Sequence, residues 1–112
     1  MEEELVRILF ERALKITTAE SCTGGLIAAT LVNVPGVSDV FDTGYITYSE
    51  ETKMRILGVK RETLEKYTVY SGEVAREMAE GAAKTAGADV ALSVTGIAGP
   101  DGGTPDFPVG LC

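Results

Sequence analysis

The sequence predicts an α/β fold of three layers, an α/β/α sandwich in which helices cover both faces of a mostly parallel or mixed sheet. Short β-branched stretches alternate along the chain with stretches of helical periodicity, as in strand and helix units wound around one sheet. The run from Val90 to Val94 is almost wholly apolar, which is typical of a strand buried between two helical layers. At 112 residues, the chain has the length of a single domain. We therefore expect one domain over residues 1–112, with ligands at the carboxyl ends of its strands.

The first half of the chain predicts five elements. Acidic residues begin the first amphipathic stretch and basic residues follow, which suits a helix and its dipole. The pair Gly24-Gly25 separates a β-branched strand from an apolar helix, and Pro35 ends that helix. Tyrosines and β-branched residues favour a second strand, and Gly58 closes the helix after it. The predicted elements are a helix over 2–13, a strand over 16–19, a helix over 26–32, a strand over 41–48 and a helix over 49–57.

The second half predicts a longer helix, a buried strand and a loop. Ser71 is a suitable N-cap for a helix that ends before Gly87. After the apolar strand, glycines and prolines dominate the chain, which favours irregular structure. The predicted elements are a helical turn over 62–66, a helix over 71–86, a strand over 90–94, a loop over 95–108 and the beginning of another strand over 109–112.

Charge and composition exclude several classes of function. Ten basic and seventeen acidic residues give a net charge of −7, which repels nucleic acids and anionic membrane surfaces. No apolar run approaches the roughly 20 residues of a membrane span, and the acidic N-terminus is unlike a signal peptide. The two cysteines, Cys22 and Cys112, lack the spacing of metal ligands. We expect a cytoplasmic protein that binds neither nucleic acids nor membranes and holds no metal.

Two glycine-rich loops follow predicted strands and carry the candidate site. The segment TTAESCTGG places Ser21 between a strand and the start of a helix, and TGIAGPDGGTPDFP follows the apolar strand. Unpaired N–H groups at a helix start favour a bound anion or a reactive oxygen. In the alternative interpretation, Ser21 and Thr23 only cap a helix, and the glycines only turn the chain. If the two loops meet, the residues lining the pocket are Ser21, Gly24, Gly25, Thr95, Gly96 and Gly99.

The sequence contains no histidine, which excludes Ser-His-Asp and Cys-His catalysis within the chain. A serine nucleophile must then use a carboxylate, a tyrosinate or a neutral lysine as its base. Tyr48 and Lys53 follow the second predicted strand closely enough to serve. Lowering a lysine pKa from about 10.4 to roughly 7–8 costs about 3–4 kcal/mol, which desolvation in a closed pocket can supply. Alternatively, Lys53 is a solvated cation paired with Glu50 or Glu51.

Three further residues have two interpretations each. Glu20 either orients a hydroxyl or an ammonium group or makes a local structural hydrogen bond. Cys22 is a rival nucleophile or a small packed side chain at the start of a helix. Asp101 either binds a metal or a ribose hydroxyl or forms a turn among the glycines.

Three ordered segments span nearly the whole chain. They are TAESCTGG, the stretch from Tyr48 to Val59, and TGIAGPDGGTP with the later triplet PVG. Together they resemble the CinA C-terminal domain family, the bacterial nicotinamide-mononucleotide amidases. The resemblance implies hydrolysis of the carboxamide of nicotinamide mononucleotide to nicotinate mononucleotide and ammonia. It also implies Ser21 as nucleophile, Lys53 as general base, Tyr48 as a relay or orienter, and the segment Thr95-Gly96 in the oxyanion hole.

The resemblance also implies the kind of ligand and partner. The substrate is a small nucleotide whose phosphate suits a helix N-terminus or a nest of backbone amides. Neither a metal nor an organic cofactor is needed for this hydrolysis, and we expect a homo-oligomer.

In one respect the chain departs from the family pattern. The family domain continues beyond residue 112 with more strand, a final helix and a basic residue that helps to bind substrate. We therefore expect an incomplete domain, truncated at its C-terminus, that exposes a sheet edge or core face unless a partner covers it. Two alternatives to the amidase stay open: a module that binds phosphate or nucleotide without hydrolysis, and an inactive truncated homologue that acts as an oligomerisation partner.

Overall fold

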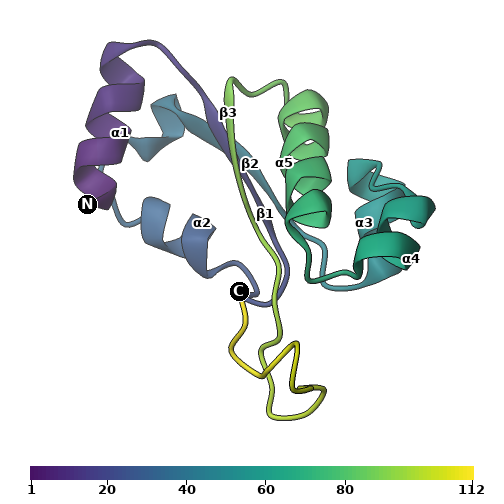
Figure 1. Ribbon diagram of the computed structural model, residues 1–112. Coiled ribbons are helices and arrows are strands. Elements are labelled where there is room, and N and C mark those ends of the chain that lie inside the picture. The colour runs from purple at the N-terminus through teal and green to yellow at the C-terminus, as the bar shows by residue number, and fades with distance from the viewer.

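The computed structural model describes residues 1–112 and contains a three-stranded parallel sheet with helices on both faces (Figure 1). This arrangement confirms the predicted α/β fold. The strands lie in the order β2-β1-β3, so β1 pairs with both neighbours. None of the helices has the length and apolar character needed to cross a bilayer. The elements are α1 (Glu2–Glu11), β1 (Ile16–Glu20), α2 (Leu26–Leu31), a 3-10 helix (Val37–Asp39), β2 (Phe41–Ile46), α3 (Glu50–Leu57), α4 (Arg61–Tyr67), α5 (Gly72–Ala86) and β3 (Val90–Val94).

The core lies on both sides of β1, all of whose residues are buried. Because successive strand residues face opposite sides, Ile16 and Ala19 belong to different apolar clusters. One cluster fills the space toward α1 and α2, and the other fills the space toward α3, α4 and α5. The first cluster is Val6, Leu9, Ile16, Leu31, Val34 and Val40; the second is Ala19, Leu57, Val59, Leu64, Val74, Met78 and Ala82.

Local signals placed the boundaries of the two helices nearest the site correctly. Ser49 caps α3 by accepting a hydrogen bond from the Thr52 N–H group at 3.2 Å, and Gly58 ends that helix at φ 72°. Ser71 caps α5 in the same way, and Gly87 ends it at φ 65°. Both helix ends require a residue in the left-handed conformation, which glycine adopts without strain.

Three details of the prediction are wrong. Residues 109–112 form no strand, because Gly110 and Leu111 instead pair with Ile97 and fold back on the second glycine-rich loop. The second strand ends at Ile46 rather than at residue 48, because the chain turns there toward α3. Finally, β3 is not buried on both faces. Ser93 points to α5, whereas Leu92 on the other face is 44% exposed because α1 and α2 leave it partly uncovered.

Candidate active site

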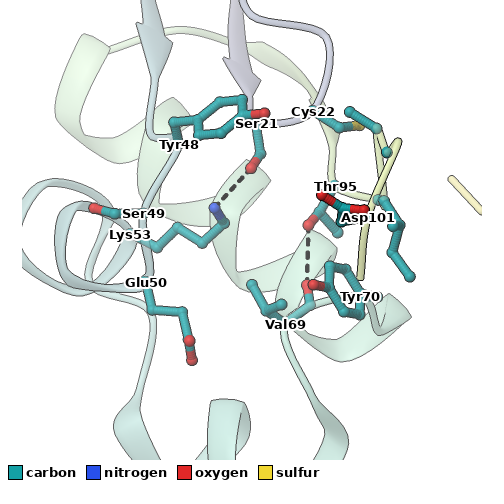
Figure 2. A pocket seen from close by; sticks show the side chains of 14 residues that line it. Ser21, Cys22, Tyr48, Ser49, Glu50, Lys53, Val69, Tyr70, Thr95 and Asp101 are labelled. Atoms are coloured by element: carbon teal, nitrogen blue, oxygen red, sulfur yellow. Dashed lines mark hydrogen bonds between the residues drawn. The ribbon is translucent and has the colours of Figure 1, made fainter. Parts of the chain in front are cut away.

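The candidate site is centred on a contact between Ser21 and Lys53 at the carboxyl end of the central strand. Ser21 directly follows β1, and its N–H group donates to the Val94 carbonyl at 3.1 Å. Lys53 lies in the first turn of α3, and its side chain extends toward Ser21. Its Nζ donates to Ser21 Oγ at 2.8 Å and to the Thr47 carbonyl at 2.6 Å (Figure 2). The two residues that the family resemblance pairs as nucleophile and base therefore lie within hydrogen-bond distance of each other.

Local structure fixes Lys53 in this position. Ser49 and Thr52 form a capping box, in which each side chain accepts from the other residue's backbone N–H group, at 3.2 and 3.3 Å. This reciprocal cap defines where α3 begins and hence the direction of its first turn. The Lys53 N–H group then donates to the Ser49 carbonyl, which places the side chain on the face toward Ser21.

Burial gives Lys53 the electrostatics of a candidate base. Its side chain is 1% exposed, and no carboxylate forms a salt bridge with it. Desolvation by burial lowers the pKa of Lys53 below its usual value, and the charge of Glu50, with that of Cys22 when its thiol is ionised, only partly opposes this effect. The alternative interpretation, a solvated lysine paired with Glu50 or Glu51, is wrong, because Lys53 is buried and forms no salt bridge with either glutamate. Glu51 instead pairs with Arg55 at 2.8 Å.

Tyr48 lies at the mouth of the same cavity. It belongs to the connection between β2 and α3, and its side chain is 66% exposed. Figure 2 shows its ring beside the Ser21 and Lys53 pair, but its hydroxyl makes no hydrogen bond to either residue. A relay role for Tyr48 therefore rests on the family resemblance and not on a contact in this structure.

The cavity above the pair has a volume of about 450 Å³. It is formed where the chain leaves β1 and β3, and the start of α3 closes one side. Thr95, Gly96 and Gly99 line it, so the second glycine-rich loop meets Ser21 as expected. Thr95 Oγ1 donates to the Val69 carbonyl at 2.9 Å, which ties this loop to the connection between α4 and α5 (Figure 2).

The expectation that Gly24 and Gly25 line the cavity is wrong. Both adopt left-handed conformations, at φ 63° and 107°, and carry the chain away from Ser21 into α2. Gly25 lies against Ile46, and a Cβ atom there would meet the Ile46 side chain at 3.0 Å. The two glycines therefore serve the turn.

The start of α2 also differs from the expectation of a free anion site. The helix begins at Leu26, so Ser21 does not cap it. The carboxylate of Glu20 instead accepts the N–H groups of Ile27 and Ala28 at 2.8 and 2.9 Å. Of the two interpretations given for Glu20, the local hydrogen bond is the one that the structure contains. This carboxylate thus occupies donors at the start of α2, one of the helix starts where the sequence favoured a bound anion.

Backbone donors are nonetheless available beside Ser21. The N–H groups of Cys22 and Gly96 have no hydrogen-bond partner within the protein, and both residues line the cavity. Residue 96 has no room for a side chain, because a Cβ atom on Gly96 would lie 2.2 Å from the Leu111 carbonyl oxygen. Unpaired N–H groups are the kind of donor that stabilises a negative oxygen in an oxyanion hole.

Several other residues complete the lining. The pKa of the Cys22 thiol is raised, chiefly by burial and also by the neighbouring Cys112. Asp101 lines the cavity with an exposed side chain, and no group of three or more carboxylate or cysteine side chains is arranged to hold a metal ion. Val69 and Tyr70 contribute from the connection between α4 and α5. Sequence reasoning missed these two, because they belong to no glycine-rich loop or reactive motif.

Comparison with known proteins identifies the family. The sequence pattern of the CinA C-terminal domain matches residues 1–112. A competence-damage inducible protein of Clostridium botulinum is 60% identical over 111 residues, which are 99% of this chain and 27% of the relative. The corresponding protein of Clostridium kluyveri is 55% identical over the same shares. The chain therefore belongs to the CinA C-terminal domain family, and it spans about a quarter of the length of these relatives.

Solved structures agree with this assignment. A CinA superfamily protein from Escherichia coli superposes with a TM-score of 0.92 at 40% identity, over 97% of this chain and 63% of that one. The competence damage-inducible protein A from Klebsiella pneumoniae gives a TM-score of 0.92 at 42% identity, over 97% and 68% of the two chains. The fold described above is thus that of the family over about two thirds of these structures.

Proposed function

We propose that the chain is an amidohydrolase domain that converts nicotinamide mononucleotide to nicotinate mononucleotide and ammonia. The observation that carries the proposal is the 2.8 Å contact between Ser21 Oγ and the buried Nζ of Lys53. A serine beside a desolvated lysine with no carboxylate partner is the arrangement that serine-lysine acyl transfer needs in a chain without histidine. The substrate is taken from the family resemblance.

In the reactive state, Lys53 is a neutral amine. One of its N–H groups donates to the Thr47 carbonyl, while its lone pair accepts the Ser21 hydroxyl proton. Ser21 Oγ then attacks the carboxamide carbon, and the proton moves to Lys53 Nζ. The resulting ammonium returns this proton to the departing amide nitrogen, so that ammonia leaves and an acyl ester remains on Ser21. Water hydrolyses the ester with Lys53 again as base, which releases the carboxylate product.

The negative oxygen of the tetrahedral intermediate requires donors. The free N–H groups of Cys22 and Gly96 are the candidates, because both lie at the cavity and neither has a partner. One such donor is worth about 2.7–4 kcal/mol of transition-state stabilisation. We therefore assign the oxyanion hole to these backbone groups and assign a structural role to the Thr95 hydroxyl, which is already bonded to Val69.

Charge in the cavity bears on the orientation of the substrate. Lys53 is the only basic side chain among the lining residues, whereas Glu50 and Asp101 are acidic. We propose that the cationic pyridinium ring enters beside these acids and the Tyr70 ring, which favour positive charge. The basic residue expected beyond residue 112 is the candidate partner for the phosphate. A cytoplasmic location and a homo-oligomer stay predictions from the sequence.

The test is turnover of nicotinamide mononucleotide by the purified chain and by Ser21→Ala. We expect the unaltered chain to release ammonia and nicotinate mononucleotide in equal amounts, and the variant to lose at least about 10³-fold in kcat. Both products are measured, ammonia by a coupled enzymatic assay and the acid by chromatography. Equal turnover by the variant contradicts the serine mechanism. Binding of the nucleotide without turnover by either protein favours the non-catalytic module.

A further inference from the structure

The side chain of Glu20 is fully buried on the α2 side of the sheet, and no basic residue pairs with it. Its carboxylate is satisfied by three donors that all follow it in the chain. Oε1 accepts from Thr23 Oγ1 at 2.7 Å and from the Ile27 N–H group at 2.8 Å, and Oε2 accepts from the Ala28 N–H group at 2.9 Å. A buried carboxylate is tolerated only when its acceptor sites are filled in this way.

These bonds close the loop that carries Ser21. The backbone of Glu20 belongs to β1, while its carboxylate holds the first turn of α2. At its start the loop is also held by the bond from the Ser21 N–H group to the Val94 carbonyl at 3.1 Å. At its far end, α2 is only six residues long and has no side-chain cap apart from this carboxylate. Two further backbone hydrogen bonds, from Gly24 to Ser21 and from Leu26 to Thr23, join residues of the loop only to each other. The carboxylate is therefore the link from the far end of the loop back to the sheet.

We propose that Glu20 is a positioning residue for the nucleophile, an inference that rests on the proposed function. By joining the far end of the loop to the sheet, it fixes the direction of Ser21 Oγ toward Lys53 and the place of Cys22 in the cavity lining. It touches neither the substrate nor the reacting atoms, because it lies on the opposite face of the sheet from Lys53 and is absent from the cavity lining. An error of about 1 Å in such a constellation lowers the rate by about 100-fold.

A second glutamate in the same chain provides a matched control. Glu77 accepts the Lys60 N–H group at 2.8 Å and Thr63 Oγ1 at 2.6 Å, so it caps the start of α4 with the same types of donor. It lies away from the cavity. A carboxylate that only stabilises a helix would affect folding at either position, whereas a positioning role would affect turnover only at Glu20.

The experiment compares Glu20→Gln and Glu77→Gln with the unaltered chain. The amide keeps the shape of the side chain but turns one acceptor into a donor, which must then face an N–H group of Ile27 or Ala28. For Glu20→Gln we expect kcat to fall by about 100-fold while KM changes by less than about threefold. For Glu77→Gln we expect kcat within about twofold of the unaltered chain, since no group at the cavity moves.

Amide signals in two-dimensional ¹H–¹⁵N spectra give a readout that does not depend on turnover. We expect the Ser21 and Cys22 signals to shift in Glu20→Gln and to stay in place in Glu77→Gln. Unchanged kcat in Glu20→Gln, unmoved Ser21 and Cys22 signals, or an equal loss of kcat in Glu77→Gln would each overturn the inference. If the unaltered chain itself releases no ammonia, the proposed function fails and these signals alone decide the role of Glu20.

A milder variant covers the case in which Glu20→Gln does not fold. Thr23→Val removes one of the three donors to the carboxylate and keeps the shape of the side chain and the backbone N–H group. We expect kcat to fall by about tenfold and KM to stay the same, because the loss of one donor displaces Ser21 less than Glu20→Gln does. An unchanged kcat in this folded variant overturns the positioning role.

Discussion

Lys53 Nζ lies 2.8 Å from Ser21 Oγ, although 32 positions separate the two residues in the chain. The contact exists because β1 is the central strand and α3 starts at the same edge of the sheet, where Thr47 also offers its carbonyl to the lysine. The strand, the helix and the Thr47 carbonyl that hold this contact come from different parts of the chain. The reactivity of the pair therefore depends on tertiary packing, and it can be tested at several independent points.

The first prediction concerns Lys53→Met, which keeps an unbranched apolar side chain of similar shape but removes the terminal amine. Since the proposed task of Lys53 is proton transfer, we expect kcat to fall by about 10²–10⁴-fold. Binding of nicotinamide mononucleotide, measured by calorimetry, is expected to change little. The role of base is contradicted if affinity collapses while turnover at saturation persists, because Lys53 would then be a substrate clamp.

The second prediction concerns pH. Burial lowers the pKa of Lys53, and only the neutral amine can act as base. We expect kcat/KM to rise with pH and to level off at a pH below about 10.4, the usual value for lysine. Steady-state rates between pH 6 and pH 10 measure this profile. A flat profile, or the same rise in the residual activity of Lys53→Met, would exclude Lys53 as its origin.

The second prediction extends to folding, because the same lowered pKa links stability to pH. Between the folded and unfolded pKa values of Lys53, the unfolded chain binds more protons, so the free energy of unfolding rises with pH in that window. The cost of burying this lysine is thus largest below the folded pKa and fades as the pH approaches about 10.4. Urea denaturation of the unaltered chain and of Lys53→Met measures it. We expect the difference between their stabilities to move in favour of the unaltered chain as the pH rises.

The third prediction separates Ser21 from the rival nucleophile. Burial raises the pKa of Cys22, so its thiol carries little thiolate near neutral pH. The group proposed to act at this position is its backbone N–H, which Cys22→Ser retains. We expect this variant to lose less than about tenfold in kcat, in contrast to the loss of at least about 10³-fold in Ser21→Ala. The reverse order of the two losses would assign the nucleophile to Cys22.

The fourth prediction tests the close approach at the second glycine-rich loop. A Cβ atom at Gly96 would lie 2.2 Å from the Leu111 oxygen and 3.2 Å from Cys22 Sγ, so Gly96→Ala must displace backbone at the proposed oxyanion hole. The loss of one aligned donor predicts a fall of about 10²–10³-fold in kcat. Gly72→Ala is the control, since a Cβ atom there meets nothing within 4 Å and its φ is not in the left-handed region. Full activity in Gly96→Ala would exclude this N–H group from the oxyanion hole.

The fifth prediction concerns the packing that supports α3. A Cβ atom at Gly81 of α5 would lie 1.8 Å from the Leu57 carbonyl oxygen at the end of α3. Gly81→Ala is therefore expected to lower the free energy of unfolding by about 1–3 kcal/mol, although alanine favours a helix by about 1 kcal/mol. Chemical denaturation measures this change, with Gly72→Ala in the same helix as the control. Equal stability of the two variants would contradict the tight contact.

Much of this protein was predictable from local signals. The caps Ser49 and Ser71 and the closing glycines Gly58 and Gly87 marked helix ends, because their preferences act within one turn of the chain. The absence of histidine directed attention to Lys53 as the base for Ser21. The helix ends were predicted correctly because capping depends on few neighbours, whereas the role of Lys53 as base stays a prediction.

Tertiary packing decided the rest. It buried Lys53 to 1% exposure, whereas the same segment read alone also suited a solvated lysine. It turned Gly24 and Gly25 away from the cavity, and it filled the start of α2 with the Glu20 carboxylate in place of a ligand. Sequence patterns name the candidate reactive groups of this chain, but desolvation, direction and the occupation of backbone donors depend on segments that meet only in the folded state.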